Sequence, residues 1–147
     1  MTPAKVRTTI VTGPSAAARE TAILAALDAG VSIAVLLEGV PDGSDRFHDD
    51  DNHGGRLHGG RIHGGRISEL RRDPGFRLLP VVRIAPGCLC CIGNLAMRVH
   101  LNRLLREKPQ RLFIGISTAE HLAALQKFLS QPPYDALLDM TEILQAF

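Results

Sequence analysis

The sequence predicts an α/β domain in three layers, with a mainly parallel sheet of about five strands and helices on both faces. Short apolar runs rich in β-branched residues alternate with longer segments whose apolar residues recur at helical spacing. The chain has 147 residues, of which 45% are hydrophobic, and this favours one domain with a substantial core. We therefore expect a single domain over residues 1–147.

The N-terminal third supplies one strand-helix-strand unit. Residues 6–11 are a β-rich run, residues 16–29 are Ala-rich with apolar side chains at helical spacing, and residues 31–37 are a second run of strand length. Gly30 follows the helical segment, where glycine commonly ends a helix. Elements in such quick succession indicate a βαβ unit and a parallel sheet.

Residues 41–66 interrupt this alternation. An acidic patch at residues 49–51 precedes three copies of His-Gly-Gly-Arg, whose paired glycines oppose a helix and offer no side chain to pack. A flexible loop is the prediction. Its histidines are candidate transient metal ligands, and the alternative is a solvated insertion without a ligand role. These histidines are His48, His53, His58 and His63.

The alternation then resumes. We expect a short helix over residues 68–72, a strand over residues 78–84 interrupted or edged at Pro80, and an amphipathic helix over residues 94–107. The inward face of that long helix is predicted to hold Leu95, Val99, Leu101, Leu104 and Leu105. The remaining elements are predicted as strand, helix, strand and short helix, at residues 112–116, 118–129, 134–138 and 141–147.

Three cysteines, Cys88, Cys90 and Cys91, lie within four positions, which does not make a disulfide framework. On an extended segment Cys88 and Cys90 share a face, so both sulfurs can meet one ion. Three thiolates suit zinc or a similar soft metal, and His100 or a loop histidine would complete a tetrahedron. The alternatives are small buried residues without a ligand and a redox-active thiol.

Three motifs in this order resemble the CobW-type P-loop GTPases, a family that includes metal chaperones and cobalamin-synthesis factors. Residues 8–13 are similar to the family's first strand running into its phosphate loop, and residues 87–91 match its Gly-Cys-x-Cys-Cys signature. Residues 109–114, followed by Ser117, are similar to the strand that leads to the family's second acidic motif. The resemblance implies a P-loop-like, truncated fold. It also implies a role in metal delivery, storage or sensing, with a client metalloprotein or a second copy as partner.

The nucleotide motifs of that family are degraded in this sequence. A working phosphate loop reads G-x-x-x-x-G-K-[ST]. Counted from Gly13, Ala18 replaces the second glycine, Arg19 the lysine, and Glu20 the hydroxyl that holds Mg²⁺. Gly13, Arg19 and a shifted Thr21 are the remaining candidates for phosphate contact, but the Glu20 carboxylate would repel a triphosphate. We therefore expect neither GTP as a ligand nor GTP hydrolysis.

The second acidic motif has also lost its glutamate, because Gly115 stands near that position, and the sequence contains no guanine-reading Asn-Lys-x-Asp motif. The net charge of +2 gives no case for nucleic acid, although the Gly-Gly-Arg repeats resemble RNA-binding segments. No apolar run reaches the length of about eighteen residues that a membrane span needs. Clustered thiols without a disulfide framework favour the cytoplasm.

Two other functions remain open from the sequence. The first is a metal-free interaction or dimerisation module that uses an exposed edge strand or an apolar face. The second is a residual nucleotide-binding protein in which Arg19 takes the place of the lysine, since arginine also binds phosphate.

Overall fold

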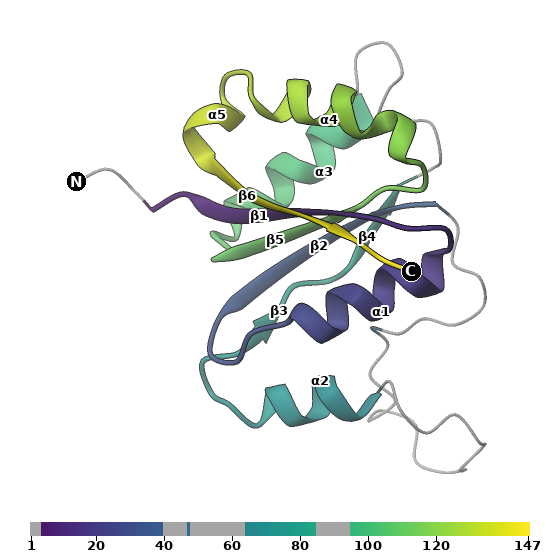
Figure 1. Ribbon diagram of the computed structural model, residues 1–147. Coiled ribbons are helices and arrows are strands. Elements are labelled where there is room, and N and C mark those ends of the chain that lie inside the picture. The colour runs from purple at the N-terminus through teal and green to yellow at the C-terminus, as the bar shows by residue number, and fades with distance from the viewer. Residues whose placement is uncertain (1–3, 40–46, 48–63, 85–94) are drawn as a thin grey trace.

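A computed structural model describes residues 4–39, 47, 64–84 and 95–147. The described strands form a six-stranded sheet in which every pairing is parallel, as the sequence predicts. The strand order is β3-β2-β5-β1-β6, and β4 also pairs with β2 (Figure 1). The strands are β1 (Val6–Thr12), β2 (Ser32–Glu38), β3 (Arg77–Leu78), β4 (Val82–Ile84), β5 (Arg111–Gly115) and β6 (Leu138–Gln145).

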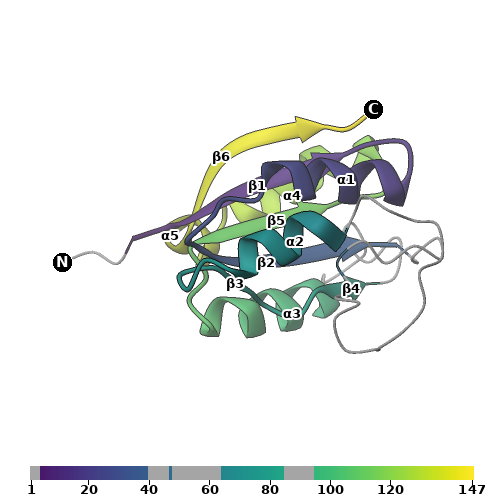
Figure 2. The same cartoon turned by 90° about the horizontal axis from the view of Figure 1, so that it is seen from below.

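Helices cover both faces of this sheet, which gives the three layers (Figures 1 and 2). One face carries α1 (Ala16–Ala26) and α2 (Gly64–Arg71), and the other carries α3 (Leu95–Arg106), α4 (Leu122–Leu129) and the short α5 (Tyr134–Leu137). Each face has its own apolar core. Ile23, Ile67 and Phe113 belong to the first, while Met97, Leu112 and Leu125 belong to the second.

The central strands alternate between these two cores, as a period of two requires. In β5, Phe113 faces the α1 side, whereas Leu112 and Ile114 face the α3 side. The strand is buried along its whole length, which explains why it reads as a continuous apolar run. This burial holds the carboxyl ends of β1, β2 and β5 side by side.

Local sequence explains where several helices begin and end. The Ser15 hydroxyl accepts a hydrogen bond from the Ala18 N–H at 3.0 Å and caps α1. Gly30 adopts a φ of 74°, which lets the chain turn back toward β2.

The helix predicted over residues 94–107 matches α3 to within one residue at each end, but its predicted inward face was partly wrong. Leu95 and Val99 are exposed, and Met97 is buried instead.

The predicted strand at residues 78–84 exists as two short strands, β3 and β4, with Pro80 between them. Residues 118–129 form a 3₁₀ turn, η2 (Ala119–His121), followed by α4. The predicted loop over residues 41–66 was wrong at its end, because residues 64–66 belong to α2. Buried Ile67 and Leu70 hold this helix against the sheet and outweigh the helix-opposing glycines.

The last two predictions were also wrong. Residues 134–137 form a helix, not a strand, and Tyr134 packs its ring on Phe128 with centroids 5.2 Å apart. Residues 138–145 form β6, where a terminal helix was expected. The β1–β6 register shifts between Thr8 and Thr9, so β6 contains a bulge that breaks the alternation by which a strand is recognised.

Candidate functional site

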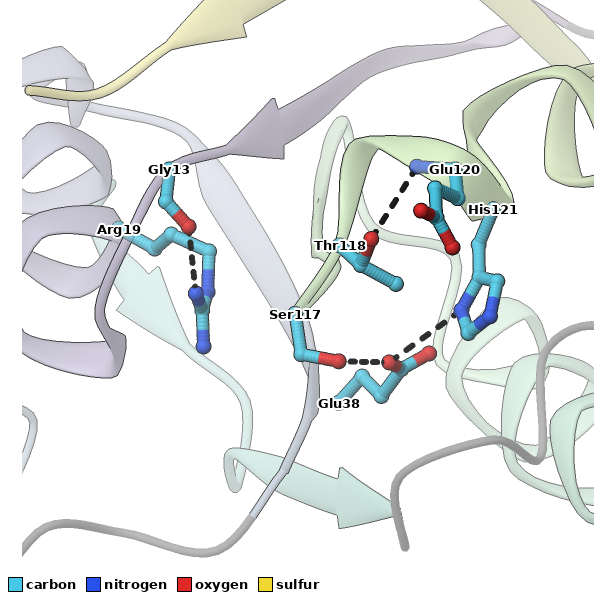
Figure 3. A network of polar contacts seen from close by, with 7 residues as sticks. All are labelled: Gly13, Arg19, Glu38, Ser117, Thr118, Glu120 and His121. Atoms are coloured by element: carbon cyan, nitrogen blue, oxygen red, sulfur yellow. Dashed lines mark hydrogen bonds and ion pairs between the residues drawn. The ribbon is translucent and has the colours of Figure 1, made fainter.

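Polar side chains gather at the carboxyl edge of the parallel sheet, the edge where open α/β sheets usually bind ligands. Glu38 ends β2, Gly13 follows β1, and Ser117 and His121 follow β5 (Figure 3). Parallel pairing brings these three strand ends together although they lie far apart in the sequence.

Glu38 is the centre of this cluster. Glu38 is only 3% exposed, and it ends a strand that is apolar from Ile33 to Leu37. The Ser117 hydroxyl donates a hydrogen bond to Oε1 of Glu38, and Nδ1 of His121 lies 3.6 Å from the same oxygen. The other oxygen, Oε2, is buried and has no hydrogen-bond partner among the described residues. Burial of a carboxylate oxygen without a hydrogen-bond partner costs free energy, so such an atom needs a specific explanation.

The position of His121 follows from local capping. Thr118 is the N-cap of η2, and its side-chain oxygen accepts a hydrogen bond from the Glu120 N–H at 3.2 Å. This tight turn aims the imidazole of His121 at Glu38 and leaves Glu120 exposed (Figure 3). The η2 turn thereby brings His121 into contact with the buried carboxylate of Glu38.

A second buried carboxylate lies at the start of α1. Glu20 is 1% exposed, and its Oε1 accepts a hydrogen bond from Nη2 of Arg83 at 2.6 Å. Its Oε2 is buried without a hydrogen-bond partner in the described part of the chain. The ion pair connects α1 to β4 across the edge of the sheet.

Arg19, in the first turn of α1, contacts the loop that follows β1. Its Nη1 donates to the carbonyl oxygen of Gly13 at 2.7 Å, so the guanidinium lies back along the loop after β1 (Figure 3). A Cβ at Gly13 would lie 2.8 Å from the Cβ of Ala146, so that glycine packs tightly against the end of β6. The space between Arg19, Glu20, Glu38 and neighbouring side chains is too small for a water molecule. Arg19, Glu20 and Glu38 therefore pack closely at this edge of the sheet.

The chain is similar in part to a zinc chaperone. It is 39% identical over 62 residues to the zinc chaperone YeiR of Escherichia coli K12. The match covers 42% of this chain and 19% of YeiR, so it spans about a fifth of that relative's length. No family model matches the chain, and no solved structure matches it with significance. YeiR is a CobW-family protein, so the match supports the resemblance over that stretch.

The structure brings together two of the three predicted phosphate contacts, Gly13 and Arg19, through the hydrogen bond described above. Thr21 is exposed on α1 and lines a groove with Gln145 and Phe147 instead. His100 lies on α3 with a buried Nδ1 that has no hydrogen-bond partner among the described residues.

The other predicted metal ligands lie outside the described residues: Cys88, Cys90, Cys91, His48, His53, His58 and His63. Within the described ranges, histidines, cysteines and carboxylates do not form a group of three that could hold a metal ion. No helix in the same ranges is long and apolar enough to cross a membrane.

The sequence contained one signal for the cluster that was missed. Glu38 is a lone carboxylate directly after the apolar run at residues 31–37. A charged residue at the carboxyl end of a buried parallel strand commonly belongs to a site, since that end faces the ligand edge of the sheet.

Proposed function

We propose that this chain is a CobW-like domain that binds zinc, or a similar soft metal, through Cys88, Cys90 and Cys91. It acts in the delivery, storage or sensing of that metal in the cytoplasm, and it does not hydrolyse GTP. The similarity to YeiR supports a metal-related role, and the Gly-Cys-x-Cys-Cys motif supplies thiolate donors that zinc prefers.

The observation that carries the proposal is the place where β4 ends. Ile84, the last residue of β4, is the Cα partner of Glu38 in the parallel ladder with β2. Cys88 follows Ile84 by four residues, a length of chain that spans at most about 14 Å. This length of chain would allow the thiolate motif to reach Glu38, whose buried Oε2 has no hydrogen-bond partner among the described residues. A carboxylate oxygen is an accepted fourth ligand for zinc, so Glu38 joins His100 and the loop histidines as a candidate.

The geometry near Arg19 supports the absence of nucleotide chemistry. Phosphate binding needs free N–H groups and a cation at the start of the first helix. Here the Ser15 side chain takes up one first-turn N–H, and Arg19 donates to Gly13. Glu20 adds a buried negative charge in the same place.

The test is metal content and zinc affinity of reduced, anaerobically handled protein. We expect one tightly bound zinc per chain, lost in a triple Cys88/Cys90/Cys91→Ser variant. Glu38→Gln should weaken zinc binding, whereas the exposed neighbour variant Glu120→Gln should leave it unchanged. Zinc binding unaltered by the triple substitution would refute the proposal. Heat released on addition of GTP with Mg²⁺ would refute the non-nucleotide part alone.

A second candidate is a metal-free interaction module, which the exposed edge of the sheet favours. Among the described strands β6 pairs only with β1, and its Ile143 is 46% exposed. An unpaired edge with an apolar side chain is a template for pairing with another strand. Size-exclusion chromatography with light scattering tests this function, and a monomer at high concentration would argue against self-pairing.

A further inference from the structure

A cavity of about 620 Å³ lies at the opposite edge of the sheet from the Glu38 cluster. It is formed by the residues that lead into β1, by the turn between α3 and β5, and by the end of α5. Its volume falls within the range of about 300–1,000 Å³ that is usual for small-molecule sites. Most of its lining is apolar, with Val6, Leu105 and Leu137 as the larger contributors.

Three cations surround this apolar lining, namely Lys5, Arg7 and Lys108. None of the described residues that line the cavity is acidic. The three cations make no ion pair with any residue in the described ranges, although Asp139 stands opposite Arg7 in the β1–β6 ladder.

Two acidic residues near this edge pair with other cations. Glu107, next to Lys108 in sequence, pairs with Arg77 at 2.8 Å instead. Asp28 lies 3.6 Å from Arg111, the neighbour of Arg7 on β5. Burial, and then the charge of Arg7, lower the pKa of Arg111, whereas the carboxylates of Asp28 and Glu142 raise it.

The backbone at Lys108 is also unusual. Its φ is 52°, in the left-handed region that glycine adopts without strain and a lysine does not. The N–H groups of Glu107 and Lys108 donate to the carbonyl oxygens of Leu104 and Leu105, which closes the end of α3. A glycine would end this helix with less backbone strain, so folding alone does not explain a lysine at the rim of the cavity.

We propose that this cavity binds a small amphipathic organic anion, an apolar chain or ring that carries one carboxylate. The apolar walls would hold the body of the ligand, and the cations at the rim would hold its charge. The site lies away from the Glu38 cluster and does not depend on metal binding.

The test compares decanoate with decanol, which has the same chain but no charge, by calorimetry and by chemical-shift perturbation on the full chain. We expect saturable binding of decanoate and at least tenfold weaker binding of decanol. Lys108→Gly should weaken decanoate binding about tenfold while keeping the fold, because glycine accepts the left-handed φ. Arg7→Gln should weaken it similarly.

Lys127→Gln is the matched control, because Lys127 is an exposed lysine on α4 that does not line the cavity. It should bind decanoate like the parent. Equal binding of decanol and decanoate, equal weakening in the Lys127 variant, or no saturable binding to well-folded protein would each overturn the proposal. Binding to anionic phospholipid vesicles without binding of free decanoate would also overturn it, in favour of a membrane-surface contact.

Discussion

Loss of the Arg83 charge should destabilise the protein far more than loss of an exposed arginine. Glu20 is 1% exposed, and Arg83 is its charged partner at 2.6 Å. Removal of one partner from a buried ion pair costs about 3–5 kcal/mol, because the other charge stays buried. The Arg83 side chain is 21% exposed, so water offsets part of the loss. We therefore expect Arg83→Met to lower the free energy of unfolding by about 3 kcal/mol.

Urea denaturation followed by far-ultraviolet circular dichroism measures this change, since the chain contains no Trp for fluorescence. In thermal melts the same loss corresponds to a decrease in Tm of roughly 6–12 °C for a chain of this size. Glu20→Gln in the Arg83→Met background should recover part of the lost free energy of unfolding, because the double variant no longer buries an unpaired Glu20 carboxylate.

The exposed pair of Arg77 and Glu107 provides the matched control. Its ion pair is 2.8 Å long, but the two side chains are 58% and 54% exposed. Such pairs contribute about 0–1 kcal/mol, so Arg77→Met should change the free energy of unfolding by less than about 1 kcal/mol. Equal losses for Arg77→Met and Arg83→Met would refute the reasoning, because burial would then not determine the strength of the pair.

Three other changes test the fold. Burial raises the pKa of Tyr134 above its usual 10.0, so the unfolded chain ionises first and stability should fall as pH rises through and above that value. Tyr134→Phe should remove this decline and cost about 1 kcal/mol for the lost hydrogen bond to Asn102, and near-ultraviolet absorbance reports the titration directly because this is the single tyrosine. Gly115→Ala should cost about 1 kcal/mol in urea denaturation, because its Cβ would lie 2.8 Å from Cδ2 of the buried Leu37 side chain, which must rotate away, and an unchanged midpoint would contradict this packing. Ser15→Ala should cost about 1 kcal/mol through loss of the α1 cap, whereas Ser15→Asp should retain most of the stability in the same measurement.

The elements that the sequence predicted correctly have a clear apolar pattern, either a continuous run or a helical repeat. β5 is a continuous apolar run because both of its faces are buried, and α3 repeats its buried residues at helical spacing. The errors occur where tertiary contacts override the pattern. Tyr134 has strand propensity, yet its ring packs on Phe128 from a short helix. The bulge in β6 displaces the alternation that would have marked that segment as a strand.

The candidate site was harder to predict, because its residues come from separate segments. Glu38, Ser117 and His121 meet only when β2 and β5 pair in parallel. Sequence spacing alone does not give that register. The replacement of the lysine and the hydroxyl of the phosphate-loop motif was visible in the sequence, because it is a local change. The residue types around Arg19 did not indicate that its side chain would turn back to the carbonyl oxygen of Gly13.

The strand order also bears on how the chain reaches its native state. The first two strands of the chain are not neighbours, because β5 lies between β1 and β2 and pairs with both. During synthesis β1 therefore emerges long before its partners β5 and β6, and β2 can pair only with the short strands β3 and β4 until β5 is made. Non-local parallel pairing of this kind is slow and leaves strand edges exposed to aggregation. The ribosome-bound N-terminal half of this protein should accordingly depend on chaperones more than a chain whose first strands pair with each other.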